Sequence, residues 1–302
     1  MTETLIPTLP EARRRAAADV PYPRGSDGRS AERLSAHYVA ERRLADRLRA
    51  TRTPEERRRV CATMYDELFA VVPDHPRLTG QGASTASRER TLEWDVAQLR
   101  PYLRSDSVFL EVGAGDCALA RRVAREVERV YAVDISRQAN VQLPTNAHFV
   151  LTDGTSIDVA PESVDVAFSD QLMEHLHPDD AAAQLRNIHR ALKPGGVYVC
   201  VTPNRLYGPS DISRYFDDIA TGFHLREYSV GELLAIFRAA GFSRAHVYIG
   251  ARGYFLRVPA WSVRLIEAAL EKLPAMLRRR VAHNAILRAV LGVRVAAIKG
   301  SE

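Results

Sequence analysis

The chain has few cysteines. Only three occur in 302 residues, and they stand far apart at Cys61, Cys117 and Cys200. No two of them have the spacing of a metal-binding pair, and an odd, scattered set does not form a disulfide framework. We therefore expect a protein of a reducing compartment, and predict that it is cytoplasmic.

Long hydrophobic runs are also lacking. No stretch of 18 or more uninterrupted apolar residues occurs, and the first residues do not combine a cationic start with an apolar run. We therefore expect neither a membrane span nor an export signal.

Most of the chain has no excess of positive or negative charge. The formal net charge is +5, and residues 261–302 alone hold eight Lys or Arg against three Glu. The remaining sequence is balanced, so a basic nucleic-acid footprint along the whole chain is excluded, whereas a local basic surface is retained.

The N-terminal third is helical in pattern. Prolines and glycines among charged residues predict a flexible arm over residues 1–28. Helical periodicity follows over 30–50, and a second helix begins at Thr53, where Glu56 completes a capping box. We predict a helical cap over residues 29–83 and a larger domain over 84–302, which opens with a helix near 84–103.

Strand and helix patterns alternate in the larger domain, which favours parallel strands joined by crossover helices. Helices are expected at 116–127, 179–192 and 229–240. The expected strands are 107–112, 129–134, 147–151, 164–169, 196–202, 244–249 and 292–299. The prediction is an α/β fold with a doubly wound, Rossmann-like sheet.

The segment LEVGAGDCALA, residues 110–120, places a glycine turn between a strand and a helix. Such turns bind dinucleotides or S-adenosylmethionine, and an acidic residue about 20 positions later, here Asp134, fits both. Glu111 discriminates between them, because its charge repels a pyrophosphate and attracts the ammonium and sulfonium groups of S-adenosylmethionine.

The motifs EVGAGD, AVDIS, TDG, VDVAFSDQLMEHL and LKPGG occur in this order. Together the chain resembles the class I S-adenosylmethionine-dependent methyltransferases over about residues 84–299, and is similar to the ubiquinone-pathway group of small-molecule enzymes. The resemblance implies seven strands, six parallel and the last antiparallel. It also implies a helical lid insertion at 250–291 before the last strand, which with the 203–228 loop would roof the acceptor pocket.

The resemblance also implies the residues that bind the cofactor S-adenosyl-L-methionine. They lie at the ends of the first four strands: Glu111, Gly113, Gly115, Asp134, Ile135, Asp153, Gly154, Ser169 and Asp170. Asp134 would accept from the ribose hydroxyls, Asp153 would hold adenine, and Ser169 with Asp170 would face the amino group and the donor methyl. Cys117 replaces the third glycine of the family motif, and we expect it to have ordinary helical dihedrals.

Methyl transfer often needs a base for the nucleophile. The candidates are His175, after the fourth strand, and His224, in the loop after the fifth. In the ubiquinone-pathway enzymes an acidic residue three positions before Glu174 helps to hold a metal. Here that position is Gln171, so we predict no metal requirement.

The function that follows is methyl transfer to an oxygen or nitrogen of a small-molecule or glycan acceptor. One alternative is a lipid-linked or quinone acceptor at a membrane surface, reached by peripheral contact through residues 261–299. Others are a non-catalytic cofactor-binding regulatory protein and a dinucleotide oxidoreductase. Nucleic acid is not an expected partner, because SDQL lacks the Asn-Pro-Pro-aromatic motif of base-amino methylating enzymes.

Overall fold

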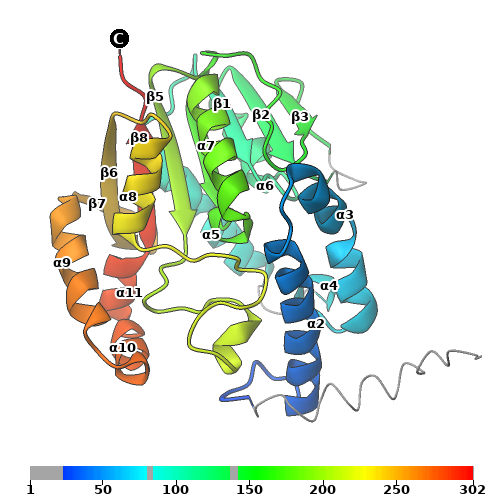
Figure 1. Cartoon of the computed structure of the whole chain (residues 1–302). Coiled ribbons are helices and arrows are strands. Elements are labelled where there is room, and N and C mark those ends of the chain that lie inside the picture. Colours follow the sequence, from blue (N-terminus) through cyan, green and yellow to red (C-terminus); the bar gives the residue numbers. More distant parts are fainter. Residues whose placement is uncertain (1–22, 80–83, 137–141, 302) are drawn as a thin grey trace, which may run out of the picture. The chain divides into compact units, whose positions relative to one another are not determined.

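The computed structural model describes residues 23–79, 84–136 and 142–301 (Figure 1). Most of the arm predicted at 1–28 lies outside these residues. The chain divides into two compact units, one drawn from Met1–Gly82 and Pro209–His224, the other from Ala83–Gly208 and Leu225–Glu302. No helix within the described residues combines the length and the apolar character needed to cross a bilayer.

The first unit is helical. Its elements are α2 (Ala31–Arg49), α3 (Pro54–Val71), α4 (Pro76–Thr79) and the 3-10 helix η2 (Ile212–Tyr215). The predicted capping box is present, because Thr53 accepts from the Glu56 amide while the Glu56 side chain accepts from that of Thr53. Tyr38 stacks on Phe216 with ring centroids 4.2 Å apart, which ties η2 to α2.

The second unit contains one eight-stranded sheet in the order β3-β2-β1-β4-β5-β8-β6-β7. The strands are β1 (Val108–Val112), β2 (Arg129–Asp134), β3 (Ala147–Leu151), β4 (Val164–Asp170), β5 (Leu192–Thr202), β6 (Arg244–Ala251), β7 (Tyr254–Val258) and β8 (Val293–Ile298). The strands β3, β2, β1, β4 and β5 pair in parallel, and β8 runs antiparallel to both β5 and β6. The doubly wound α/β fold and the antiparallel last strand are confirmed.

The predicted strand count of seven is wrong by one. The range 250–291 was expected to be a helical insertion, but it begins with β7, which pairs antiparallel with β6. Arg252 and Gly253 have φ angles of 56° and 84°, the left-handed geometry of a tight hairpin turn. Three helices follow: α9 (Ala260–Glu271), α10 (Ala275–Ala282) and α11 (Ala285–Leu291).

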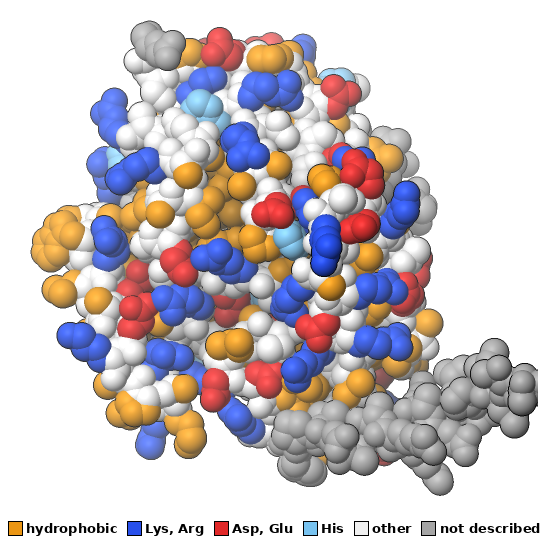
Figure 2. Space-filling view, viewed as in Figure 1, with side chains coloured by type: hydrophobic (Ala, Val, Ile, Leu, Met, Phe, Trp, Pro, Cys, Tyr) orange, Lys and Arg blue, Asp and Glu red, His pale blue; other side chains and the backbone are white. Residues whose placement is uncertain are grey.

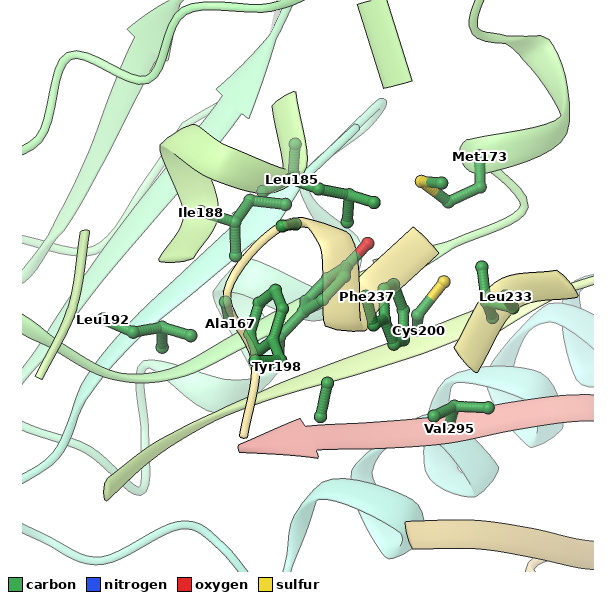
Figure 3. Close-up of a cluster of buried hydrophobic side chains, with 14 of the residues drawn as sticks. Ala167, Met173, Leu185, Ile188, Leu192, Tyr198, Cys200, Leu233, Phe237 and Val295 are labelled. Atoms are coloured by element: carbon green, nitrogen blue, oxygen red, sulfur yellow. The ribbon is translucent and has the colours of Figure 1, made fainter. Parts of the chain in front are cut away.

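Helices cover both faces of the sheet. On one face α5 (Thr85–Leu99) and α6 (Ala118–Val123) bury residues such as Leu99 and Leu119 against β1 and β2. On the other, α7 (Pro178–Ala191) and α8 (Val230–Ala239) enclose Tyr198 of β5, and Figure 3 shows its ring between Leu185 of α7 and Phe237 of α8. Each such buried side chain contributes about 1.5–3 kcal/mol. The helix α6 is shorter than the predicted 116–127.

Candidate cofactor site

The carboxyl ends of β1, β2 and β4 meet at one edge of the sheet. Val112 pairs with Val133 of β2, and Glu111 pairs with Phe168 of β4. The chain order of the strands reverses between β1 and β4, so the crossovers on the two sides leave in opposite directions. In open α/β sheets ligands bind outside the strand ends at such a switch point.

The turn after β1 brings bare backbone to this edge. Gly113 and Gly115 have φ angles of 80° and 51°, which favour glycine. A Cβ atom on Gly113 would lie 3.2 Å from Leu172, whereas one on Gly115 would meet nothing within 4 Å. The backbone around Gly115 therefore faces open space, as close approach of a ligand requires.

Cys117 does not have the helical dihedrals that we expected. Its φ and ψ angles are 56° and 27°, the left-handed conformation. The reason is local, because the Cys117 amide turns back to donate to the Ala114 carbonyl (2.7 Å) before α6 begins. A side chain in this conformation costs on the order of 1–2 kcal/mol, so the third position of the motif still has the geometry that glycine prefers.

Glu111 is the most unusual carboxyl group of the site. Only 7% of the residue is exposed, and its Oε2 atom has no hydrogen-bond partner. Burial raises its pKa well above the ordinary value, and the charges of Asp116, Asp95 and Asp134 raise it further. A buried acceptor without a donor costs free energy, which a cationic ligand would recover.

Two further carboxyl groups, those of Asp95 and Asp170, lie near Glu111. Asp95 of α5 is raised in pKa to about 8 by burial and by the neighbouring charge of Asp170, while Arg294 of β8 acts in the opposite direction. Burial likewise raises the pKa of Asp170. Side chains alternate along a strand, so Glu111 and Asp170 both fall on the sheet face covered by α5. Three acidic side chains thus converge there.

Sequence reasoning missed Asp95. The only signal was its register, because Asp95 shares a helical stripe with Leu92, Val96 and Leu99, which pack into the core. A carboxyl group on the apolar stripe of a helix is partly removed from water, which shifts its pKa, and such residues gather at functional sites. No motif covers α5, so nothing directed attention to it.

Asp134 closes β2 as predicted. Its Oδ2 accepts from the Gly115 amide (2.8 Å) and its Oδ1 from the Ser136 amide (3.0 Å). A carboxylate offers about four lone-pair sites, so it retains capacity for ligand hydroxyls. The neighbouring Ile135 is 46% exposed, and a Cβ on Gly154 would lie 3.6 Å from its Cγ2. Ile135 and Gly154, both predicted to bind the cofactor, are therefore adjacent.

Asp153 caps the turn after β3. Its Oδ1 accepts from the amides and the hydroxyls of Thr155 and Ser156 at 2.7–3.0 Å. These bonds hold the pKa of the carboxyl well below its ordinary value, although burial opposes them. The adenine contact remains a prediction, and the turn that would present it is built by Asp153 itself.

Ser169 lies on the opposite face of the sheet from Asp170. Its hydroxyl is buried and shares a hydrogen bond of 2.7 Å with the Tyr198 hydroxyl. The period-2 alternation of a strand puts neighbouring side chains on opposite faces. A contact of Ser169 with a cofactor at the strand end, which stays a prediction, would therefore come from its backbone.

The two predicted histidines belong to different units. His175 lies in the 3-10 helix η1 (Met173–His175) of the sheet unit. His224 lies in the first unit, where its amide donates to Asp211 Oδ2 (3.2 Å) and its carbonyl accepts from Arg49 (3.3 Å). Their roles as bases stay predictions.

Residues 110–200 match the protein family described as "Methyltransferase domain". A probable S-adenosylmethionine-dependent methyltransferase of Mycolicibacterium smegmatis is 31% identical over 137 residues, 44% of this chain and 51% of that protein. A dimethylglycine N-methyltransferase of Parasynechococcus marenigrum is 33% identical over 133 residues, 41% of this chain and 46% of that protein. The chain spans about half the length of these curated relatives.

A Burkholderia thailandensis 1,6-didemethyltoxoflavin-N1-methyltransferase, bound to its substrate and S-adenosylhomocysteine, aligns with a TM-score of 0.49 at 18% identity. The alignment covers 83% of this chain and 92% of that one.

Proposed function

We propose that the chain, whose residues 110–200 match the methyltransferase domain family, is a class I S-adenosylmethionine-dependent methyltransferase that transfers a methyl group from that cofactor to an oxygen or nitrogen of a small-molecule or glycan acceptor. The observation that supports it most is the buried Oε2 of Glu111, which has no donor and lies beside the glycine turn. The negative charge of a pyrophosphate would be repelled by this carboxyl group and by three nearby aspartates, whereas an ammonium group would be attracted to them.

The residues of the strand ends fit the cofactor part by part. The backbone around Gly115 would lie against the methionine moiety, with Glu111 near its ammonium. Asp134 would accept from ribose hydroxyls and Ile135 would flank adenine. Each charge-assisted bond contributes roughly 1.5–3 kcal/mol. When bound, S-adenosylmethionine supplies a methyl group on a positively charged sulfur.

The chain's own task in the reaction is then to align the acceptor, exclude water and accept a proton. The Asp95–Asp170 pair supports the last role, because a carboxyl group with a pKa of about 8 is near the operating pH of a general base. His175 and His224 remain candidates for the same role. A nitrogen acceptor is favoured by the dimethylglycine N-methyltransferase among the relatives and by the acidic character of the pair.

Calorimetry tests the cofactor assignment. We expect S-adenosylmethionine to bind and NAD not to bind. Glu111→Gln should weaken S-adenosylmethionine about 10- to 100-fold, roughly the contribution of one buried charged hydrogen bond. Glu128→Gln, on an exposed residue just before β2, is the matched control and should change affinity less than twofold.

A cofactor fragment sharpens this test. The nucleoside 5′-methylthioadenosine lacks the amino-acid part, so Glu111→Gln should leave its affinity unchanged. NAD binding without S-adenosylmethionine binding would contradict the proposal. If S-adenosylmethionine binds tightly but a panel of amines, phenols and sugars never yields S-adenosylhomocysteine, the catalytic part fails and a regulatory protein is favoured.

A further inference from the structure

The helix α9 is apolar on two opposite faces. Val263 and Leu270 are 1% and 5% exposed and pack inward. Trp261 and Leu265, one turn apart on the other side, are 67% and 65% exposed. At 100° per residue, Ala268 falls on the same outer stripe as these two side chains. The inner face of α9 is already packed, so its outer stripe is exposed apolar surface, and exposed apolar surface that is concentrated in one place marks an interaction site.

The next two helices continue this surface. Met276 and Leu277 of α10 are 81% and 48% exposed, and Ile286 of α11 is 74% exposed. Within the part of the chain that the structure describes, seven of the twelve exposed large hydrophobic residues fall between Tyr254 and Ile286. The concentration is too high for isolated surface residues, which are otherwise common. Figure 2 shows hydrophobic side chains projecting at the margin where α9 and α10 lie, with Lys and Arg side chains between them.

Exposed cations are interleaved with these side chains. They are Arg264, Lys272, Arg280 and Arg288. The two acidic residues of α9 do not offset them: Glu267 is only 4% exposed and accepts from Asn204, while Glu271 is paired with Arg205. We name the exposed apolar residues and these four cations together the apolar-basic surface: Trp261, Leu265, Met276, Leu277, Ile286, Arg264, Lys272, Arg280 and Arg288.

We infer that the apolar-basic surface docks onto the face of an anionic phospholipid bilayer. Short amphipathic helices with Trp and Leu on one stripe and Lys or Arg beside it lie in the plane of the interface. The helices α9, α10 and α11 have 12, 8 and 7 residues, and a helix that spans a bilayer needs about 20. Their lengths are therefore compatible with lying on the membrane surface and too short for crossing it. Tryptophan is the residue that prefers the headgroup level of a bilayer.

A second copy of the chain fits this surface poorly. In a symmetric dimer the same patch meets itself, so its four cations would face four more without intervening acids. Like charges across an interface are costly. Anionic headgroups instead attract these cations, and each Lys or Arg near the surface contributes about 1 kcal/mol to binding.

Tryptophan fluorescence gives a direct test, because the chain contains only Trp94 and Trp261. In the full-length Trp94→Phe variant all emission comes from Trp261. We expect a blue shift, and quenching by brominated lipids, when vesicles of phosphatidylcholine with phosphatidylglycerol are added. Vesicles of phosphatidylcholine alone should leave the emission nearly unchanged. In the reciprocal Trp261→Phe variant, Trp94 on α5 should not respond.

Vesicle flotation with matched variants separates the apolar and charged contributions. Leu265→Ser should lower binding at least about fivefold, from the apolar area lost at the interface. Leu151→Ser is the control, since Leu151 is also 65% exposed but lies at the end of β3. Arg264→Glu with Lys272→Glu should abolish the preference for anionic vesicles, whereas Arg186→Glu on the exposed side of α7 should not. Raising the salt from about 0.1 M to about 0.5 M should release the protein.

Three outcomes would overturn the inference: no vesicle binding, equal binding to zwitterionic and anionic vesicles, or a dimer that Leu265→Ser dissociates in sedimentation. Protection of Trp261 from acrylamide before lipid is added would likewise contradict it. Cofactor calorimetry on each variant keeps the result separate from the proposed function, because every variant should bind S-adenosylmethionine as the parent chain does.

Discussion

Two groups of carboxylates lie at the same edge of the sheet in opposite states. At the ends of β2 and β3, Asp134 and Asp153 accept hydrogen bonds from amides of their own turns. On the face covered by α5, Glu111 is buried, Asp95 and Asp170 are half-buried, and all three carboxyl groups have raised pKa values. The first group is stabilised by the fold, whereas the second is destabilised by it.

The difference indicates what each group is for. A satisfied carboxylate stabilises a turn and holds it in shape, so Asp134 and Asp153 form a preorganised part of the site. A carboxyl group whose hydrogen bonds do not compensate for its burial costs stability, and such a group is retained where a cationic ligand or a proton stabilises it. Neutralising a carboxyl group of the second group should therefore raise the stability of the cofactor-free protein, whereas removing one of the first group should lower it.

The largest stability effect is expected at Asp95. Its pKa is about 8 in the folded protein, above the ordinary value of 3.8, so the folded state holds a proton that the unfolded state has lost between these values. The contribution of Asp95 to stability thus falls as pH rises through this window. Asp95→Asn should remove this loss of stability. Its free energy of unfolding should exceed that of the parent by about 3 kcal/mol at about pH 8.5 and by little at about pH 4.

Denaturant unfolding of the cofactor-free protein at several pH values measures this effect. Asp106→Asn is the control, because Asp106 is exposed and its pKa is lowered by Arg104 instead of raised. Its stability curve should run parallel to that of the parent between about pH 5 and pH 8.5. A parallel curve for Asp95→Asn would show that Asp95 is ionised throughout this range.

Asp153 should behave in the opposite way. Asp153→Ala removes the acceptor of two amides and two hydroxyls, and should destabilise the protein by about 2 kcal/mol at neutral pH. Because the carboxyl has a lowered pKa, this stabilising contribution is present above the ordinary pKa and is lost only in strong acid.

Thermal unfolding of Asp153→Ala beside Asp158→Ala tests this prediction. Asp158 is an exposed aspartate five positions along the chain, and its replacement should change stability by less than about 0.5 kcal/mol. Equal stability of the two variants would remove Asp153 from the group of turn-stabilising carboxylates.

The smallest effect is expected in the turn that joins the two groups. Cys117→Val places a β-branched side chain at a φ angle of 56° and should cost about 1–2 kcal/mol. Cys200→Val is the matched control, because Cys200 is equally buried but lies in the extended strand β5, where valine is favoured. Urea midpoints that fall equally in both variants would mean that the left-handed geometry of Cys117 carries no cost.

Much of the fold could be read from local patterns. The Thr53 and Glu56 pair marked the start of α3, and the alternating strand and helix segments located β1 to β6 and β8 within a few residues. The strand β7 was missed because its residues, YFLRV, look like part of an aromatic insertion until the β6 edge is available for pairing. Cys117 was misjudged because an alanine-rich helix follows it directly.

The sequence by itself determined the glycine turn, the acidic residues at the strand ends and the positions of all strands but β7 along the chain, because these depend on backbone conformation and on hydrophobic periodicity. Only the tertiary structure decided which carboxylates share a face, since the packing of α5 on the sheet brings Asp95 beside Asp170 and buries Glu111. The protonation state of a carboxyl group depends on burial and on charges that arrive from distant parts of the chain, and local sequence does not encode these.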